Sequence, residues 1–236
     1  MDRNFARALA LVLKSEGGWS DNPADPGGAT MRGVTLASFR RYVKADATKG
    51  DLRRISDAQV AAVYRRFYWE AVLGAELPDG VDYAVFDFAV NSGPGRAAKY
   101  LQAAVGVAQD GRIGPATLSA IKAKPAGVLI DALCDARLAF LKRLPTWATF
   151  GRGWSDRVRT VRVQALLMSA QRPAETAPAP QPPGAETSAD AGPTVLPAPP
   201  PPSGGKTAAA AGILVLMAGA LAAFRHHVTG FFGSFF

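Results

Sequence analysis

The chain has 236 residues, of which 48% are hydrophobic, so it is long enough to bury a core of ordinary size. Its formal charge of +8 indicates an anionic partner, and the scattered Lys and Arg, without a zinc-finger, RRM or KH pattern, argue against nucleic acid. A single cysteine, Cys134, excludes an intramolecular disulfide, and we expect it to be a buried small hydrophobe. The only histidines, His226 and His227, lie near the C-terminus, which excludes a His-based metal site and Ser-His chemistry elsewhere. We therefore expect no metal and no cofactor.

An amphipathic helix is predicted at the N-terminus, with Asn4 as its N-cap and Glu16 at its end, where Gly17-Gly18 stops it. The helix dipole disfavours a negative charge at that end, and Trp19 is expected to add an apolar wall. Both effects predict a raised pKa for the Glu16 carboxyl, as a general acid needs. The apolar positions fall at i, i+4, i+7 and i+8 on one face: Phe5, Leu9, Val12 and Leu13.

Residues 16–35 read EGGWSDNPADPGGATMRGVT, a stretch so rich in Gly and Pro that we expect a structured loop. Asp25 lies in this loop among many backbone N–H groups, so it should stay ionised. Two carboxyls held in different environments are what glycosidic bond cleavage requires. Asp25 is also compatible with an Asx-turn or cap that only shapes the loop, and Asp21 is the competing acid.

The same run, preceded by an apolar helix, resembles the signature of glycoside hydrolase family 108, the N-acetylmuramidase endolysins of phages. The resemblance covers about the first ninety residues and implies a lysozyme-like helical fold, cleavage of the glycan strand of peptidoglycan, and Glu16 as the catalytic Glu. The spacing of Glu16, Asp25 and Thr30 also resembles the Glu–Asp–Thr triad of T-even phage lysozymes, in which the Thr lies one residue further from the Asp. We therefore predict these three residues as catalytic.

Further helices are predicted along the chain. Thr35 is expected to cap a helix at 36–44, and Ser56 with Gln59 forms a capping box that opens the next one. That helix ends in an aromatic cluster at 68–69, which is either a platform for sugar rings or part of the core. The mainly apolar run at 82–91 is predicted to be buried. The predicted substrate-binding residues are Trp19, Tyr68, Trp69, Asp87 and Asn91, and Glu70 and Asp87 are the alternative second carboxylates.

A second unit begins near residue 91, and its pattern of VNSG, an LQ helix and DGRIGPATL resembles the predicted peptidoglycan-binding domain that usually follows family 108 modules. The alternative is that this unit is the second lobe of a lysozyme-like fold. Helices are predicted to begin at Pro94 and Pro115, and two more are expected at about 126–144 and 155–170.

The composition then changes. Residues 172–206 are rich in Pro and Ala and cannot bury a core, which predicts a disordered linker. Residues 207–225 are charge-free up to Phe224 and weakly apolar, which predicts a single transmembrane helix, with Gly219 and Ala223 as a small-residue face for possible self-association.

The predicted architecture is all-α and lysozyme-like. The enzyme domain is expected to act on the cell wall while the C-terminal helix anchors the chain in a membrane. The predicted function is a phage-type or prophage-type muramidase that cleaves the β-1,4 bond between MurNAc and GlcNAc in the periplasm, for lysis or wall remodelling. The alternatives are a catalytically inactive, membrane-anchored peptidoglycan-binding module and a holin-like membrane protein. The predicted parts are a catalytic module at 1–90, a peptidoglycan-binding lobe at 91–171, the linker at 172–206, the transmembrane helix at 207–225 and an aromatic tail at 226–236.

Overall fold

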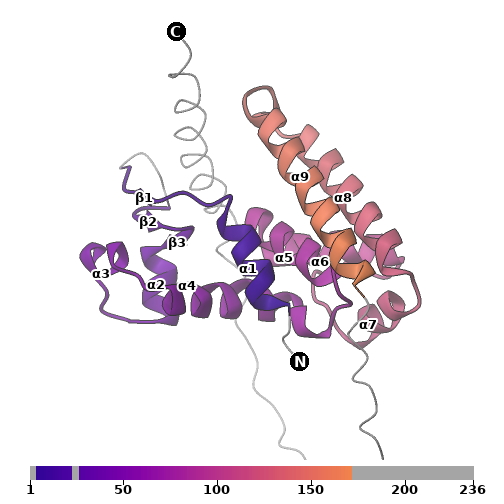
Figure 1. Ribbon diagram of the computed structural model, residues 1–236, viewed down its shortest axis with the longest axis horizontal. Coiled ribbons are helices and arrows are strands. Elements are labelled where there is room, and N and C mark those ends of the chain that lie inside the picture. Colours follow the sequence, from indigo (N-terminus) through magenta and orange to yellow (C-terminus); the bar gives the residue numbers. More distant parts are fainter. Residues whose placement is uncertain (1–3, 23–26, 172–236) are drawn as a thin grey trace, which may run out of the picture. The chain divides into compact units, whose positions relative to one another are not determined.

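The computed structural model describes residues 4–22 and 27–171 (Figure 1). This part of the chain is mainly helical, as predicted, and a small sheet follows the first helix. In chain order the elements are α1 (Phe5–Leu13), β1 (Trp19–Ser20), β2 (Thr30–Met31), β3 (Val34–Thr35), α2 (Leu36–Tyr42), α3 (Lys49–Arg53), α4 (Asp57–Tyr64), the π-helical turn η1 (Arg65–Trp69), the 3₁₀ turns η2 (Glu70–Val72) and η3 (Gly74–Glu76), α5 (Val81–Ser92), α6 (Pro94–Val105), α7 (Pro115–Lys122), α8 (Ala126–Lys142) and α9 (Trp147–Ala170).

Several predictions fall on residues outside the described ranges. These are the second acid Asp25, the linker at 172–206, the transmembrane helix at 207–225 and the tail at 226–236. Among the helices at 4–22 and 27–171, none has the length and apolarity to span a bilayer.

Helix α1 buries the predicted apolar face, but its ends differ from the prediction. Asn4 occupies the N-cap position without capping the helix through its side chain. Its amide instead donates to Asp79 Oδ1 at 2.7 Å and to Asp82 Oδ2 at 2.8 Å, which ties α1 to the start of α5. The helix ends at Leu13, so Glu16 lies in the turn that follows, where its backbone N–H donates to the Leu13 carbonyl.

A three-stranded antiparallel sheet replaces much of the predicted loop at 16–35. Strand β2 lies between β1 and β3, with Thr30 opposite both Ser20 and Thr35. Strands β2 and β3 are joined by Arg32 and Gly33, whose φ angles of 53° and 75° are the two positive values that a type I′ hairpin turn requires. Strands of two residues give almost no periodicity, which is why the alternation typical of a strand was not visible in the sequence.

Helix α5 forms the centre of the described part. Eleven of its twelve residues are buried, as expected for a helix that other elements surround. It packs against α1, α6, α8 and α9. The helix also runs through the predicted boundary between residues 90 and 91, so the residues on either side of that boundary share one core.

In the second unit, α6 and α7 begin at Pro94 and Pro115 as predicted. The DGRIGPATL loop between them is organised by the buried Gln102 amide, which donates to Asp110 Oδ1 at 2.7 Å and to the Arg112 carbonyl at 2.9 Å. Gln102 Oε1 accepts from the Gly111 N–H at 2.9 Å. This motif therefore holds the loop to α6.

Helices α8 and α9 pack against each other as a hairpin (Figure 1). Helix α9 starts at Trp147 and not near Ser155 as predicted. The two glycines at 151 and 153 argued against a helix there, because an interior glycine costs about 1 kcal/mol relative to alanine. Gly151 is nevertheless accommodated, because the Trp147 ring lies against it.

Candidate active site

The Glu16 carboxyl is enclosed by parts of the chain that lie far apart in sequence. Its side chain is only 9% exposed. The hairpin turn at Gly33 approaches it closely: a Cβ on Gly33 would lie 2.9 Å from Glu16 Oε2 and 2.1 Å from the Tyr64 hydroxyl oxygen. A glycine is thus required at this position both for its positive φ and for space.

Tyrosines from α4 and η1 form the apolar surroundings. Tyr64 and Tyr68 are buried, with ring centroids 5.5 Å apart, and the negative charge of Glu16 contributes to raising the pKa of each, after burial. The Tyr64 hydroxyl therefore remains a donor, and it donates to the Arg32 carbonyl at 3.1 Å. This bond supports the strained Arg32, whose φ of 53° is unusual for a residue with a side chain.

A buried ionic chain connects Glu16 to the second unit. Arg157 of α9 approaches Glu16, with 3.6 Å between Nη1 and Oε1, and it binds Asp87 of α5 more closely, with 3.0 Å between Nη2 and Oδ2. Arg137 of α8 also binds Asp87, with 2.6 Å between Nη1 and Oδ1. The side chains of Asp87 and Arg137 are each 2% exposed. Asp87 thus shares its charge between two guanidinium groups, and Glu16 keeps one long ion pair.

These surroundings shift the pKa values of the Glu16 and Asp87 carboxyls in opposite directions. Burial raises the pKa of Glu16, the Arg157 charge opposes this, and the Asp87 charge adds to it. Burial also acts to raise the pKa of Asp87, but Arg157 and Arg137 outweigh it and the pKa is lowered. A proton-holding acid beside a permanently ionised carboxylate is the pattern by which acid and base roles are separated. Of the two carboxyls, Glu16 is the one whose raised pKa lets it hold a proton to a higher pH than usual.

The apolar wall that we expected from Trp19 beside Glu16 stays a prediction. The Trp19 ring lies in β1, with the Arg53 guanidinium 4.3 Å from its centroid. Glu16 lies in the turn directly after the C-terminal end of α1, so the contribution of the helix dipole stays a prediction. Burial is the largest cause of the raised pKa, and the charge of the nearby Asp87 adds to it.

The other predicted residues lie in varied surroundings. Thr30 is buried in β2 and its hydroxyl donates to the Gly28 carbonyl at 3.2 Å. Asp21, the competing acid, pairs with Lys49 at 2.9 Å near the surface. Glu70 is exposed in η2. Asn91 is partly buried and accepts from the Ser92 hydroxyl at 3.1 Å.

Trp69 lies in the core, so its ring is not available for stacking on a sugar. It is 2% exposed and makes edge contacts with Phe5 and Phe86, at centroid distances of 5.4 and 5.3 Å. Tyr68 is also buried, and it belongs to the walls around Glu16. Asp87 is 2% exposed and binds Arg137 and Arg157, so its carboxylate is enclosed and not open to a substrate. Among the described residues, no group of three or more His, Cys, Asp or Glu side chains is placed to hold a metal ion.

Sequence reasoning missed Arg157, Arg137 and Tyr64. Arg157 stands in a helix with several other arginines, and its partner Glu16 lies 141 positions away, so no local pattern distinguishes it. Tyr64 was visible only as one of the apolar residues of α4.

Comparisons with known proteins find both families that the sequence resembles. The family described as Glycosyl hydrolase 108 matches residues 9–93, and the one described as Predicted Peptidoglycan domain matches residues 96–159. A solved structure, that of Brucella abortus SagA, is 46% identical with a TM-score of 0.65, and the match covers 72% of this chain and 98% of that chain. No curated protein matches the chain. The chain therefore belongs to the glycosyl hydrolase 108 family and is a peptidoglycan hydrolase of the muramidase type.

Proposed function

We propose that Glu16 is the general acid that protonates the glycosidic oxygen between MurNAc and GlcNAc. The observation that carries this role is the environment of its carboxyl, which is 9% exposed and lies next to the ionised Asp87. Proton donation to the leaving oxygen allows the C–O bond to break, and positive charge develops on the sugar ring.

Arg157 is a positioning residue in this scheme. Its guanidinium remains protonated, and Asp87 anchors it by two hydrogen bonds from Nε and Nη2. When Glu16 gives up its proton, the new carboxylate lies within 3.6 Å of that guanidinium, which stabilises the product charge. Arg157 thus limits the cost of proton release, and Asp87 keeps Glu16 protonated beforehand.

We propose Asp25 as the second carboxylate, which orients a water molecule or stabilises the charge on the sugar. The support is its place in the chain. It lies in the connection between β1 and β2, and β1 begins three residues after Glu16. The stereochemistry of the product would show which role applies, because retaining enzymes hold their carboxyls about 5 to 5.5 Å apart and inverting enzymes about 6.5 to 9.5 Å apart.

The test of Glu16 is the digestion of purified murein by Glu16→Gln. Glutamine is nearly isosteric but cannot donate this proton, and acid catalysis is worth about 10² to 10⁴ in rate. Glu76→Gln, an exposed change of the same type in η3, is the control. Borohydride reduction of the products should label MurNAc ends. If Glu16→Gln digests murein within about tenfold of the parent, the assignment is wrong.

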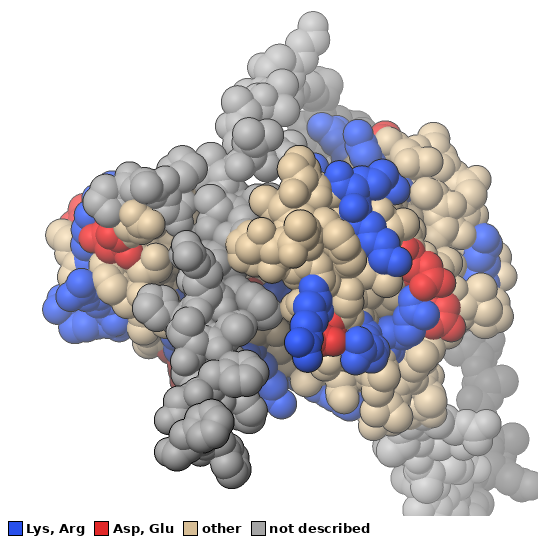
Figure 2. Space-filling view, turned by 90° about the horizontal axis from the view of Figure 1, so that it is seen from above, with Lys and Arg blue, Asp and Glu red and all other residues tan. Residues whose placement is uncertain are grey.

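We further propose that the enzyme is held on the wall by its basic surface and at a membrane by residues 207–225. Figure 2 shows one face with many more Lys and Arg than Asp and Glu side chains, in agreement with the charge of +8 and with an anionic polymer as partner. The charge-free run and the aromatic tail support the membrane anchor, with the enzyme in the periplasm and possible pairing through Gly219 and Ala223. Leu216→Arg should cost roughly 3 kcal/mol of insertion and release the chain from membranes on fractionation.

A further inference from the structure

An aromatic face on the first half of α9 leads directly to the Glu16 site. Trp147, Phe150 and Trp154 lie at i, i+3 and i+7, so they share one side of the helix, and Arg157 follows three residues later on the same side. Arg157 is the residue that reaches Glu16. We call Trp147, Phe150 and Trp154 the α9 aromatic face.

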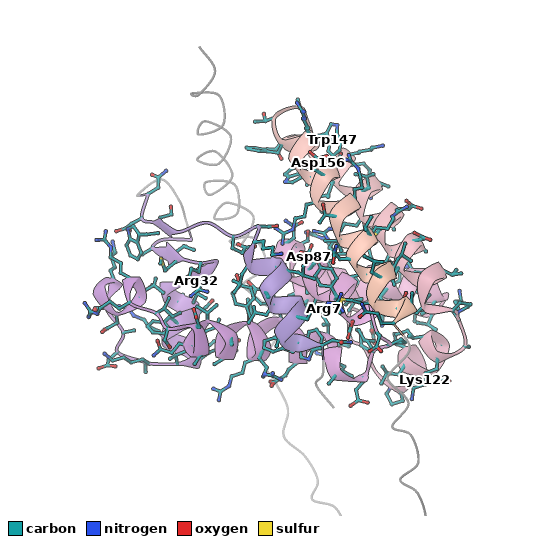
Figure 3. All side chains as sticks on the ribbon, in the orientation of Figure 1. Arg7, Arg32, Asp87, Lys122, Trp147 and Asp156 are labelled. Atoms are coloured by element: carbon teal, nitrogen blue, oxygen red, sulfur yellow. The ribbon has the colours of Figure 1, made fainter. Side chains whose placement is uncertain are left out.

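The three rings form a continuous surface. The Trp147 and Trp154 centroids are 6.2 Å apart, and those of Phe150 and Trp154 are 5.7 Å apart. All three side chains are partly exposed. Figure 3 places Trp147 at the end of the hairpin formed by α8 and α9, well away from Asp87. Trp147 and Trp154 pack partly against the core, and the rest of the aromatic surface stays open to a ligand.

The position of Trp147 is built into the helix. A Cβ on Gly151 would lie 2.6 Å from the Trp147 ring, so the indole rests against the helix backbone only because residue 151 is glycine. An alanine there would favour the helix by about 1 kcal/mol. The chain forgoes this gain and keeps the ring in place, which is expected if the placement of the ring has a use.

We propose that the α9 aromatic face is a subsite for the glycan strand of peptidoglycan, on which sugar rings stack at a distance from the bond that is cleaved. Ten residues separate Trp147 from Arg157, which is about 15 Å of helix and room for a few sugar rings. The substrate is a polymer that continues beyond the scissile bond, and this face continues from the residue beside Glu16. Indole and phenyl rings match the apolar faces of pyranose rings, and tryptophan often dominates binding energy. The proposal rests on Glu16 as the point of cleavage.

The first test compares long glycan strands with a tetrasaccharide. Phe150→Ala and Trp154→Ala should raise KM on long strands roughly tenfold with kcat retained, as expected when an aromatic contact is truncated. On the tetrasaccharide, which occupies only the positions around Glu16, the loss should be much smaller. Trp154→Phe should restore most of the binding. The control is Val163→Ala with Leu167→Ala, which removes exposed apolar side chains near the other end of the same helix.

Gly151→Ala separates a binding role from a structural one. The new methyl group should displace the Trp147 ring, while the gain in helix propensity maintains folding. We expect a Tm within a few degrees of the parent, since the gain in helix propensity offsets part of the packing lost at Trp147, together with a raised KM on long strands. A variant that keeps the parent's KM would contradict the proposal.

The second test measures binding without catalysis. Two of the four tryptophans belong to the α9 aromatic face, so soluble glycan strands added to Glu16→Gln should change its fluorescence, and Trp147→Phe with Trp154→Phe should remove most of that change. A parallel assay for new reducing ends shows whether the strands stay intact during the titration, which separates failure of this proposal from failure of Glu16 as the acid. The last measurement is the binding of the parent and the α9 variants to vesicles of phosphatidylglycerol and phosphatidylethanolamine. If the α9 variants lose vesicle binding and keep their affinity for glycan, the face is a membrane contact and the proposal is wrong.

Discussion

Replacing Asp87 with asparagine should destabilise the protein strongly, because it leaves two buried cations without their shared anion. Arg137 is 2% exposed and Arg157 is 14% exposed, and both bind the Asp87 carboxylate. Removal of one partner from a buried ion pair costs about 3 to 5 kcal/mol. In a unit of 150 to 250 residues, 1 kcal/mol corresponds to about 2 to 4 °C, so the Tm should fall by about 6 to 20 °C.

The matched control is Asp135→Asn, which makes the same chemical change in the exposed ion pair between Asp135 and Arg162. Exposed pairs are worth about 0 to 1 kcal/mol, so its Tm should stay within a few degrees of the parent. Calorimetry on the full chain measures both variants. If Asp87→Asn lowers the Tm by no more than Asp135→Asn does, the buried ionic chain does not have the role assigned to it.

The pH dependence of this loss follows from the lowered pKa of Asp87. A carboxyl whose pKa is lower in the folded state stabilises the protein above its ordinary pKa, about 3.9, and this contribution is lost as the pH falls through the folded-state value. The difference in Tm between the parent and Asp87→Asn should therefore be full at neutral pH and shrink in acid. A constant difference across this range would contradict the reasoning.

Three further predictions concern the carboxyls and the hairpin turn. Glu16→Gln should raise the Tm at neutral pH. The raised pKa of Glu16 means that its ionised form destabilises the fold above the ordinary pKa, and glutamine removes this cost. The gain in Tm should vanish in acid, and a lower Tm at pH 7 would contradict the prediction. Gly33→Ala should lower both stability and activity, since its Cβ meets Tyr64 and Glu16. Gly28→Ala, with a φ of 66° and open space, should lower the free energy of unfolding by only about 1 kcal/mol; equal effects would refute the steric argument. Asp25→Asn should cut turnover by orders of magnitude with little change in Tm, and loss of stability with activity retained would indicate a turn-forming residue.

The chemistry at Glu16 could be predicted because its residues are contiguous. The run at 16–35 combines an acid, a glycine pair and a Gly-rich turn, and that pattern alone indicated a candidate acid with a raised pKa. The cause of the shift could not be predicted in the same way. It depends on Tyr64, Asp87 and Arg157, which folding brings to Glu16 from distances of 48 to 141 positions along the chain.

The limits of local reasoning are visible in the aromatic residues too. The sequence left Trp69 either as a sugar platform or as part of the core, and only packing shows that it contacts Phe5 and Phe86 in the core. The capping box of Ser56 with Gln59 was predictable, because it is a contact across three residues, whereas the Asn4 side chain is drawn away from capping by Asp79 and Asp82, which are distant in sequence. The start of α9 could not be predicted, because the cost of Gly151 inside the helix is offset by the Trp147 ring that packs against it.

The most direct test of Glu16 as the general acid is the pH profile of kcat/KM on purified murein for the parent and for Glu16→Gln. The account predicts that the parent loses activity on the alkaline side as Glu16 gives up its proton, with an apparent pKa above the ordinary value of 4.5. It also predicts that Glu16→Gln retains at most a small residual rate without this alkaline limb. If the variant kept the same limb and a rate within about tenfold of the parent, another group would be the acid and the central claim would fail.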